Sequence, residues 1–478
     1  MPNHTVEKIG GTSMSRTHEL LKNVLMGERK GDALYNRIFV VSAYGGITND
    51  LLEHKKSGAP GVYALFSSAE SDWAWGDALD KLSKRMQEIN AEIFEDQQAL
   101  GAANAFVRER VEGVRSCLID LHRLCSYGHF RLDNHLLTVR EMLSALGEVH
   151  SAYNTALLLQ QNGVNARMVD LSGWRDEEQY SLDDNIKNAF KDIDVSKELP
   201  IVTGYAQSKE ALMKTYDRGY SEVTLSRIAV ITEAKEAIIH KEFHLSSADP
   251  KVVGEDAVQV IGDTNYDVAD QLSNMGMEAI HPSAAKGLRQ ANIPLRIKNS
   301  FEPEHPGTTI NATDQGKNAG VEIITGLDNV IAFEFFEQDM VGVKGYDTRI
   351  LDALTRHKVQ IISKTSNANT ITHFLKGSLK NIKRVEVDLS KEFPAAEISS
   401  RKVAFISAIG RNLKGCDVGA KAILALAKAG ITPLSMQDLL RKVDVQIIVD
   451  RSDYESSIKI LHEALVEKTE ALGKKLAA

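Results

Sequence analysis

Over residues 1–315, short apolar runs alternate with longer stretches in which apolar positions recur every three or four residues. The runs at 37–43, 166–170 and 199–205 are rich in β-branched residues, which is typical of buried strands. The longer stretches predict amphipathic helices that bury one face. This alternation favours an α/β fold, whose loops gather at the carboxyl ends of the strands. The apolar positions of the two longest helical stretches are Leu79, Leu82, Met86, Ile89 and Ile93, and then Val107, Val111, Val114, Leu118 and Leu121.

A repeat organises the second half of the chain. Apolar strands begin at Val330 and at Val403, and each is followed by a glycine-containing loop, an amphipathic helix and a further strand. This order of strands and helices is that of small α+β modules. The pattern therefore predicts two such modules behind the α/β domain. A purely structural or dimerising tail is the alternative.

The stretch from Val6 to Ser13 is the strongest candidate for chemistry. An apolar strand turns at Gly10 and Gly11 into a segment that looks helical. A strand that turns through glycines into a helix directs several backbone N–H groups to one point, which suits an oxyanion. Lys8 adds a full positive charge, so the pattern favours a phosphate-binding turn. The alternative is an ordinary strand–turn–helix with a solvated lysine, because short glycine motifs often occur without a function.

Composition narrows the class of protein. The net charge is −8 and no basic block stands out, so nucleic acid is not an expected partner. The three cysteines, Cys117, Cys125 and Cys416, have no metal-ligand spacing, which favours a reducing compartment. The N-terminus lacks a signal pattern and no apolar run reaches membrane-spanning length. We therefore expect a cytoplasmic protein that does not span a membrane.

The segment 8–13, Lys-Ile-Gly-Gly-Thr-Ser, resembles the Lys-Phe-Gly-Gly-Thr-Ser opening of the aspartokinases. Three further elements of that family follow in the same order: Ser-Ala-x-x-Gly-x-Thr-Asn at 42–49, Arg-Gly-x-Ser at 218–221, and Asn-Ser…Pro-Gly-Thr at 299–308. The resemblance covers nearly the whole chain. It implies an amino-acid kinase fold, in which helices sandwich a parallel-rich sheet, followed by two ferredoxin-like ACT domains. The implied boundaries are 1–315 for the kinase domain, and 316–400 and 401–478 for the ACT domains.

The resemblance also implies an activity, the transfer of the ATP γ-phosphoryl group to the side-chain carboxylate of L-aspartate to give 4-phospho-L-aspartate. Lys8 and Arg218 would be catalytic, with Lys8 on the phosphoryl group and Arg218 on the aspartate α-carboxylate, which a guanidinium grips through two hydrogen bonds. Glu141 would hold the substrate ammonium, since the family motif Gly-Glu-x-x-Ser aligns there with Arg140 in place of glycine. The implied nucleotide-binding residues are Lys8, Gly10, Gly11, Thr12, Asp249 and Lys251. The implied substrate-binding residues are Ser42, Thr48, Glu141, Arg218, Ser221 and Glu222.

The nucleotide region departs from the family pattern. His240, Lys241, Ser246 and Glu278 stand where relatives carry other side chains, so contacts to the base and ribose are not transferred to this chain. The cofactors implied are ATP and Mg²⁺. The Mg²⁺ ion would bridge the phosphates, and no residue is assigned to it.

The ACT domains imply an amino-acid effector and a homodimer. Lysine-inhibited relatives carry acidic side chains where Ile362 and Ala368 stand here, so an effector would be held differently. The product usually serves lysine, threonine or methionine synthesis. The departures at Arg140, Lys241 and Glu278 resemble instead the aspartokinases linked to ectoine synthesis.

Three alternatives stay open at this point. A kinase of the same fold acting on another acid, such as glutamate, would share the motifs, although the paired ACT modules argue against it. An ACT-containing amino-acid sensor with a decayed kinase domain would explain the altered nucleotide region. A nicotinamide oxidoreductase is the weakest alternative, because the chain lacks Gly-x-Gly-x-x-Gly.

Overall fold

The protein divides into two compact units. The first unit comprises residues 1–245 and 280–312, and the second comprises 246–279 and 313–478. The predicted division into 1–315, 316–400 and 401–478 refers to sequence modules and stays a prediction. The computed structural model describes residues 3–55, 57–68, 72–216, 219–277, 280–312, 316 and 319–467.

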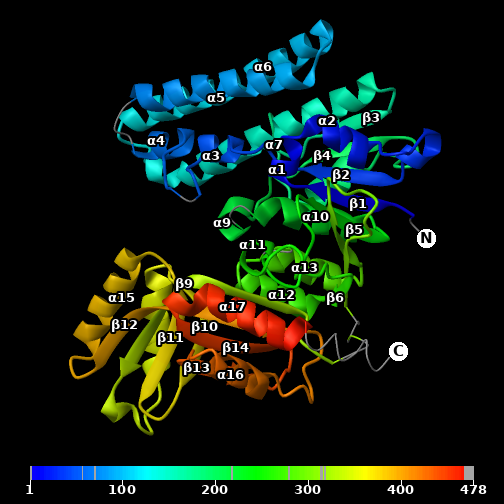
Figure 1. Ribbon diagram of the computed structural model, residues 1–478. Coiled ribbons are helices and arrows are strands. Elements are labelled where there is room, and N and C mark those ends of the chain that lie inside the picture. The colour runs from blue at the N-terminus through cyan, green and yellow to red at the C-terminus, as the bar shows by residue number, and fades with distance from the viewer. Residues whose placement is uncertain are drawn as a thin grey trace, which may run out of the picture. The chain divides into compact units, whose positions relative to one another are not determined.

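A largely parallel sheet forms the centre of the first unit, as the sequence pattern predicts (Figure 1). The strands of this sheet that belong to the first unit follow the order β3-β4-β2-β1-β5-β7-β8, and among these described strands β8 alone runs antiparallel to its neighbour β7. The central strand β1 lies between β2 and β5, so its carboxyl end meets the loops that follow both neighbours. The strands are β1 (Thr5–Ile9), β2 (Arg37–Val41), β3 (Ala166–Val169), β4 (Leu199–Thr203), β5 (Glu236–Lys241), β7 (Leu295–Asn299) and β8 (Thr308–Asn311).

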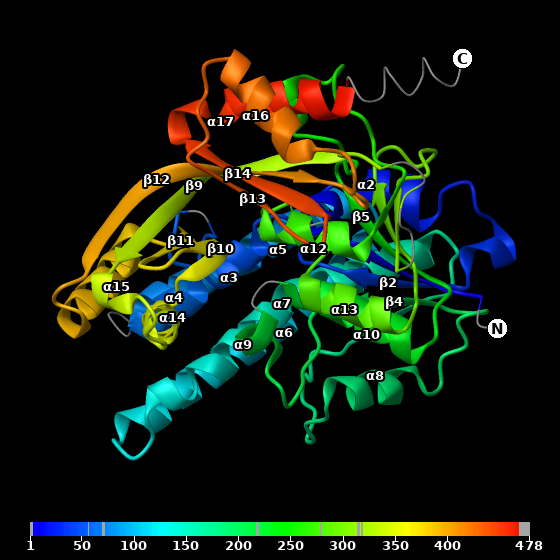
Figure 2. The same ribbon diagram turned by 90° about the horizontal axis from the view of Figure 1, so that it is seen from below.

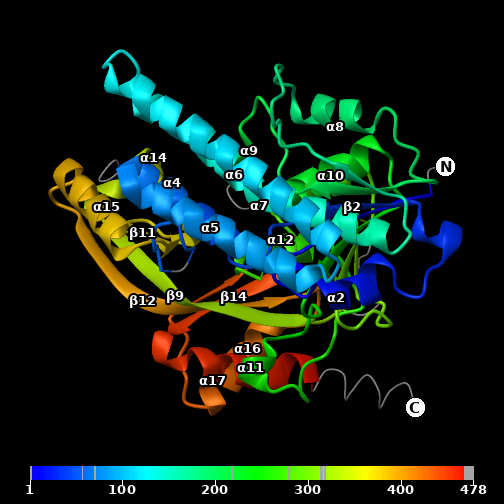
Figure 3. The same ribbon diagram turned by 90° about the horizontal axis from the view of Figure 1, so that it is seen from above.

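Helices pack on this sheet, and the longest of them run alongside one another (Figures 1 and 3). Helix α6 packs against both α5 and α7 through the apolar stripes that the sequence shows at intervals of three and four. The long helices are α5 (Asp72–Ile93), α6 (Gln97–Ser126) and α7 (Leu136–Gln161). The shorter ones are α1 (Gly11–Met14), α2 (Thr17–Leu20), η1 (Leu21–Leu25), η2 (Gly31–Leu34), α3 (Ile47–Leu51), α4 (Val62–Ser68), η3 (Leu132–Asn134), α8 (Leu182–Phe190), α9 (Leu212–Tyr216), α10 (Tyr220–Ile231) and α13 (Pro282–Gln290).

A buried ionic cluster anchors β1 to both of its neighbours. Glu7 accepts hydrogen bonds from Arg37 Nε at 2.8 Å and from His240 Nε2 at 2.7 Å. Burial alone would raise the pKa of Glu7, but Arg37 and His240 hold it well below its usual range. Arg37 also donates to two carbonyl groups of η1. Because successive side chains of a strand point to opposite faces, Lys8 projects from the other side of the sheet.

An antiparallel six-stranded sheet forms the second unit, with the order β10-β11-β9-β12-β14-β13 (Figure 2). Its two central strands, β9 and β12, are 14 and 13 residues long, and both repeats predicted from the sequence share them. The strands are β9 (Ile323–Phe336), β10 (Gln360–Ser366), β11 (Thr370–Lys376), β12 (Glu397–Ile409), β13 (Ser435–Asp438) and β14 (Asp444–Asp450), with the short β6 (Asp263–Asn265) outside this sheet. The helices are α11 (Pro250–Val253), α12 (Tyr266–Asn274), η5 (Gln338–Met340), α14 (Tyr346–Arg356), α15 (Leu379–Glu392), α16 (Val418–Lys428), η6 (Arg451–Asp453), α17 (Tyr454–His462) and η7 (Glu463–Glu467).

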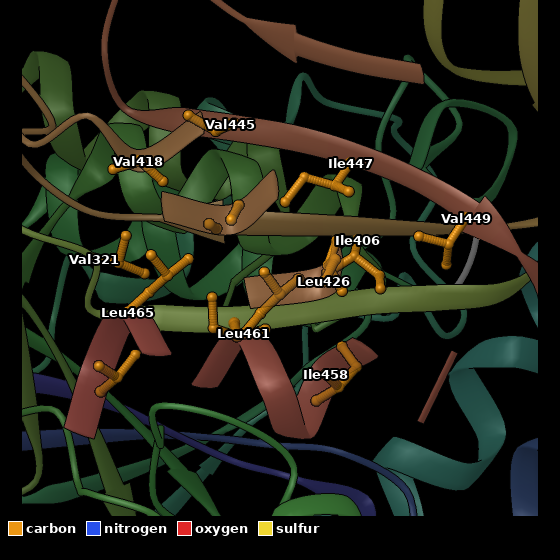
Figure 4. Packing of buried hydrophobic residues seen from close by; sticks show 14 of the residues in the cluster. Val321, Ile406, Val418, Leu426, Val445, Ile447, Val449, Ile458, Leu461 and Leu465 are labelled. Atoms are coloured by element: carbon orange, nitrogen blue, oxygen red, sulfur yellow. The ribbon is translucent and has the colours of Figure 1, made fainter. Parts of the chain in front are cut away.

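Two apolar cores stabilise the second unit, one for each repeat. One core lies beneath α14 and α15, and the other lies between the sheet and the pair α16 and α17. Figure 4 shows the second core, in which Leu461 of α17 and Leu426 of α16 pack against Ile406 of β12. The helical residues recur at intervals of three or four and the strand residues at intervals of two, which is why the sequence reveals both element types. Within the described residues, no helix is long and apolar enough to cross a membrane.

We expect Leu461→Ala to lower the free energy of unfolding of the second unit by about 2–5 kcal/mol, because it leaves a cavity in a closed core. Leu461 is fully buried, whereas Leu440 is 99% exposed and provides the matched control. Leu440→Ala should change the free energy of unfolding by no more than about 0.5 kcal/mol. Urea denaturation followed by circular dichroism measures both values, and equal effects would contradict the packing described.

Candidate active site

The turn from β1 into α1 is built by two glycines with different tasks. Gly10 is the N-cap of α1, and its N–H donates to the carbonyl of His240 at 3.2 Å. Gly11 lies so close to the loop after β2 that a Cβ atom would be 2.6 Å from the carbonyl oxygen of Ala43. The N–H of Ser42 donates to the Ile9 carbonyl at 3.2 Å. The two glycine-rich loops predicted from the sequence therefore pack against each other.

The first turn of α1 offers backbone donors at this point. The first N–H groups of a helix have no carbonyl partner within the helix, so those of Gly11 and Thr12 are available to an acceptor. The next residue, Ser13, is buried, and Ser300 donates to its hydroxyl oxygen at 3.1 Å. The N–H of Ser300 in turn donates to the carbonyl of Lys241 at 2.8 Å. The loops after β1, β5 and β7 are thereby joined at one edge of the sheet.

Lys8 faces a buried carboxylate. Its Nζ lies 3.5 Å from Oε1 of Glu222 on α10, and each side chain is 12% exposed. The other carboxylate oxygen, Oε2, accepts a hydrogen bond from the N–H of His281 at 2.5 Å. Burial acts to raise the pKa of Glu222, but Lys8 and Lys241 outweigh it and hold the pKa below its ordinary value. Glu222 is therefore ionised at neutral pH and partly neutralises Lys8.

A second carboxylate, Glu148 on α7, lies within the electrostatic reach of Lys8. Its Oε1 accepts a hydrogen bond from the hydroxyl of Ser221 at 2.8 Å. Its Oε2 is buried and has no hydrogen-bond partner among the described residues. Burial raises the pKa of Glu148 to about 8, although the Ser221 hydroxyl and Lys8 oppose the rise. An unpartnered carboxylate oxygen of this kind is suited to a ligand that brings its own positive charge.

Glu141 lies two turns earlier on the same helix and is fully engaged by the protein. Its Oε2 accepts from the hydroxyl of Tyr205 at 2.5 Å, and its Oε1 accepts from the N–H of Met213 at 2.7 Å. These bonds connect α7 to the end of β4 and to α9. In this structure Glu141 therefore holds α7 to the segments that carry Tyr205 and Met213. The hydrogen bonds of the described residues do not join Glu141 to Lys8 or Ser221.

The remaining predicted residues fall into three groups. Ser42 lies on the loop after β2, beside the Gly10–Gly11 turn, and Thr48 lies in α3. Arg218 lies outside the described residues, although Gly219 behind it is packed so closely that a Cβ atom would be 2.3 Å from the ring of His281. In the second unit, Asp249 caps α11 by accepting the N–H of Lys251 at 2.9 Å, and the Lys251 side chain is exposed.

Comparisons with known proteins identify the family of the chain. Residues 3–299 match the amino acid kinase family. The chain is also 52% identical over 464 residues to Aspartate kinase Ask_Ect from Stutzerimonas stutzeri (strain A1501), an alignment that covers 97% of this chain and 98% of the relative.

The chain belongs to the aspartate kinases of the amino acid kinase family.

Solved aspartate kinases share its fold. A crystal structure of E. coli aspartokinase III with aspartate and ADP superposes with a TM-score of 0.73 at 17% identity, covering 97% of this chain and 100% of that one. The crystal structure of the same E. coli enzyme with lysine and aspartate also superposes with a TM-score of 0.73 at 17% identity, covering 97% of this chain and 99% of that one. The crystal structure of the Clostridium acetobutylicum aspartate kinase superposes with a TM-score of 0.70 at 20% identity, covering 96% of this chain and 100% of that one. The predicted amino-acid kinase fold with C-terminal ACT modules, and the predicted enzyme class, are confirmed.

Sequence reasoning missed Glu148, although a signal for it was present. The aspartate kinase motif Gly-Glu-x-x-Ser is complete at Gly147, Glu148 and Ser151, whereas the prediction placed it seven residues earlier with Arg140 in the glycine position. The glycine has a physical reason, since a Cβ atom on Gly147 would be 2.8 Å from Cβ of Ala43. Residues seven apart share one face of a helix, so periodicity alone could not separate the two glutamates.

The donor set of the site suits a nucleotide with a divalent cation. The described residues contain no group of three or more histidine, cysteine, aspartate or glutamate side chains placed to hold a metal. Mg²⁺ does not require such a group, because it is usually held by one or two carboxylates together with phosphates and water. Glu222, ionised and next to Lys8, is a carboxylate of the kind that fits this role.

We expect Gly11→Ala to disrupt the site and Gly10→Ala to leave its fold intact. The added Cβ would overlap the Ala43 carbonyl in the first variant, but would make an ordinary 3.5 Å contact with the His240 carbonyl in the second. Gly10 also has φ −71°, which alanine adopts without strain. Gly11→Ala should lower kcat by at least about tenfold, since small displacements of reacting groups are costly. Melting temperature and aspartate kinase activity test the pair, and a harmless Gly11→Ala would contradict the packing.

Proposed function

We propose that Lys8 and the turn after it bind the transferring phosphoryl group of ATP, while Glu148, Ser221 and Arg218 hold L-aspartate with its side-chain carboxylate in line. The product would be 4-phospho-L-aspartate with ADP. The position of Lys8 between two buried carboxylates, at the edge where four loops meet, is the observation that supports this proposal most directly.

The chemistry requires positioning more than proton transfer. A side-chain carboxyl group has a reference pKa near 3.9, so aspartate arrives ionised and needs no general base. The main obstacle is repulsion between this carboxylate and the triphosphate. A preorganised cation at the point where charge develops stabilises the transition state without further reorganisation. The Lys8 ammonium would provide that charge, supported by the N–H groups of Gly11 and Thr12. Gly10 would shape the turn, because its own N–H is bonded to His240.

Recognition of aspartate would use opposite charges for its two remaining groups. The unpartnered oxygen of Glu148 would accept the substrate ammonium, and Ser221 would keep that carboxylate in place. Arg218 would hold the α-carboxylate through two parallel hydrogen bonds. Ser42, on the loop packed against the Gly10–Gly11 turn, and Thr48, on α3, would add neutral hydrogen bonds. Glu141 would support this arrangement through Tyr205.

Groups outside the turn would complete the binding of the nucleotide. Mg²⁺, when bound, would neutralise part of the triphosphate charge, and Glu222 is the carboxylate that would hold it. Asp249 and Lys251 remain proposed nucleotide contacts. Lys241 places a second cation near Glu222, at a position where relatives carry an acid.

The pathway and the regulation are further parts of the proposal. The relative of highest identity reported above bears the name Ask_Ect, which supports a role in ectoine synthesis. E. coli aspartokinase III has been crystallised with lysine, which supports an amino-acid effector at the ACT modules. Because Ile362 is apolar, it could not bind the ammonium group of such an effector by charge, and other groups would have to do so. We also propose a homodimer formed through these modules.

We expect Lys8→Met to lower kcat by about 10²–10³-fold with a modest change in KM, because the lost interaction acts mainly in the transition state. Trapping the acyl phosphate with hydroxylamine measures the activity, since aspartyl hydroxamate forms only when the carboxylate has been phosphorylated. Circular dichroism controls for folding. An unchanged kcat would exclude Lys8 from the reaction, and a glutamyl rather than an aspartyl hydroxamate would indicate the other substrate.

We expect kcat/KM for aspartate to increase with pH up to about 8, the pKa to which burial raises Glu148. Below that pH the carboxyl group is protonated and neutral, so it cannot hold an ammonium by charge, and kcat/KM should fall about tenfold per pH unit. Glu148→Gln should raise KM and remove this pH dependence. Glu141→Gln is the matched control and should keep it. If Glu141→Gln instead removed the pH dependence and Glu148→Gln kept it, Glu141 would be the residue that binds the substrate ammonium.

A further inference from the structure

The first unit contains a cavity of about 580 Å³ that the proposed reaction does not use. It lies between the neighbouring helices α6 and α7 and two loops, at 172–179 and 205–211. Neither Lys8 nor Glu148 nor Ser221 lines it. Its volume is in the range of small-molecule sites.

One wall of this cavity is apolar and the facing loops are polar. Val114, Leu146 and Val149 belong to the helical wall. The loops contribute Ser172, Trp174 and Ser208, and the Oγ, Nε1 and Oγ atoms of these residues are buried without a hydrogen-bond partner among the described residues. Ser208 is only 9% exposed. Buried polar groups in folded proteins are nearly always paired with protein or water, so three groups without a protein partner around one cavity provide a polar wall suited to a ligand.

The charges around the cavity favour an anion. Lys209 lines the cavity, is exposed and has no ion pair among the described residues. Arg175 also lines it and pairs with Glu109 at 3.4 Å. The guanidinium of Arg110 lies 4.7 Å from the centre of the Trp174 ring and pairs with Asp170 at 2.7 Å. The acidic side chain in the lining, Glu141, already accepts two hydrogen bonds. A carboxylate would accept from the Trp174 N–H and the two serine hydroxyls while meeting the positive side chains.

We infer that this cavity is a second ligand site, which binds a small organic acid whose apolar body packs on α6 and α7 and whose carboxylate faces Ser172, Trp174 and Ser208. This ligand is chemically distinct from aspartate, which has no apolar body.

The cavity shares one wall with the proposed aspartate site. Tyr205 lines the cavity and donates its hydroxyl to Glu141. Its ring also packs edge-on against Tyr220, with ring centres 5.6 Å apart, and Tyr220 precedes Ser221. A ligand that shifts Tyr205 would therefore alter the grip on aspartate. This coupling rests on the proposed function, whereas binding to the cavity does not.

Calorimetry on the full chain without substrates tests the site. The probes are 3-phenylpropanoate, 4-methylpentanoate and 4-methyl-2-oxopentanoate, with 3-phenylpropan-1-ol as the uncharged control and acetate as the control without an apolar body. We expect at least one acid to bind with Kd of about 1 mM or below, and both controls to bind at least about tenfold more weakly. No binding of any acid up to about 10 mM would overturn the proposal.

Variants locate the bound acid. Ser208→Ala and Trp174→Phe each remove one hydrogen-bonding group and should weaken binding by about three- to tenfold, whereas Met142→Trp should abolish it by filling the space. Ser196→Ala and Trp73→Phe are matched controls at exposed positions and should bind normally. Unchanged binding in all three cavity variants would overturn the site, and equal binding of the alcohol would overturn the assigned ligand class.

A kinetic measurement tests the coupling separately. A saturating acid should change KM for aspartate by at least about twofold, and Met142→Trp should remove this effect, since ligand coupling is commonly of this order or larger. Calorimetric binding without any change in KM would overturn the link through Tyr205. Inhibition that competes with aspartate and persists in Met142→Trp would place the acid at the substrate site and overturn the proposal.

Discussion

The position of Lys8 between Glu222 and Glu148 is the interaction on which the rest of the structure depends. A buried ammonium is costly unless neighbouring groups compensate its charge. Glu222 does so by remaining ionised, whereas Glu148 is pushed by burial toward its neutral form. The cation is therefore stabilised without being fully neutralised. In the proposed reaction such a lysine would act on a phosphate, and the Glu148 carboxyl group would ionise against the substrate ammonium.

The close approach of backbone segments is what brings these groups together. Gly11 touches the carbonyl of Ala43, and Gly147 brings α7 against Cβ of the same residue. The loop after β2 is thereby held between the phosphate turn and the helix that carries Glu148. On the opposite face of the sheet, the buried cluster of Glu7, Arg37 and His240 ties β1 to both neighbouring strands. Side chains on separate elements keep their geometry because the backbones beneath them cannot move apart.

Local motifs predicted the strand, turn and helix that carry part of the proposed site, and long-range packing explains how its side chains meet. The strand, glycine turn and helix around Lys8 follow from their own sequence. The structure places Ser221 and Glu222 side by side on α10, where Ser221 donates to the Glu148 carboxylate and Glu222 faces the Lys8 ammonium. Glu148 was missed because a partial motif around Glu141 lies on the same helical face. The structure separates the two glutamates through their partners: Tyr205 and Met213 engage both oxygens of the first, whereas one oxygen of the second has none among the described residues.

The sequence by itself determined the alternation of strands and helices, the repeat in the second half and the order of motifs that defines the family, because each depends on periodicity or on contiguous residues. Only the tertiary structure decided that β9 and β12 each extend through both repeats, which carboxylates face Lys8, and where a second cavity lies. Glu222 stands 214 positions from Lys8 along the chain. Such neighbours are set by how helices and strands pack, and the spacing of residues in the sequence carries no record of that distance.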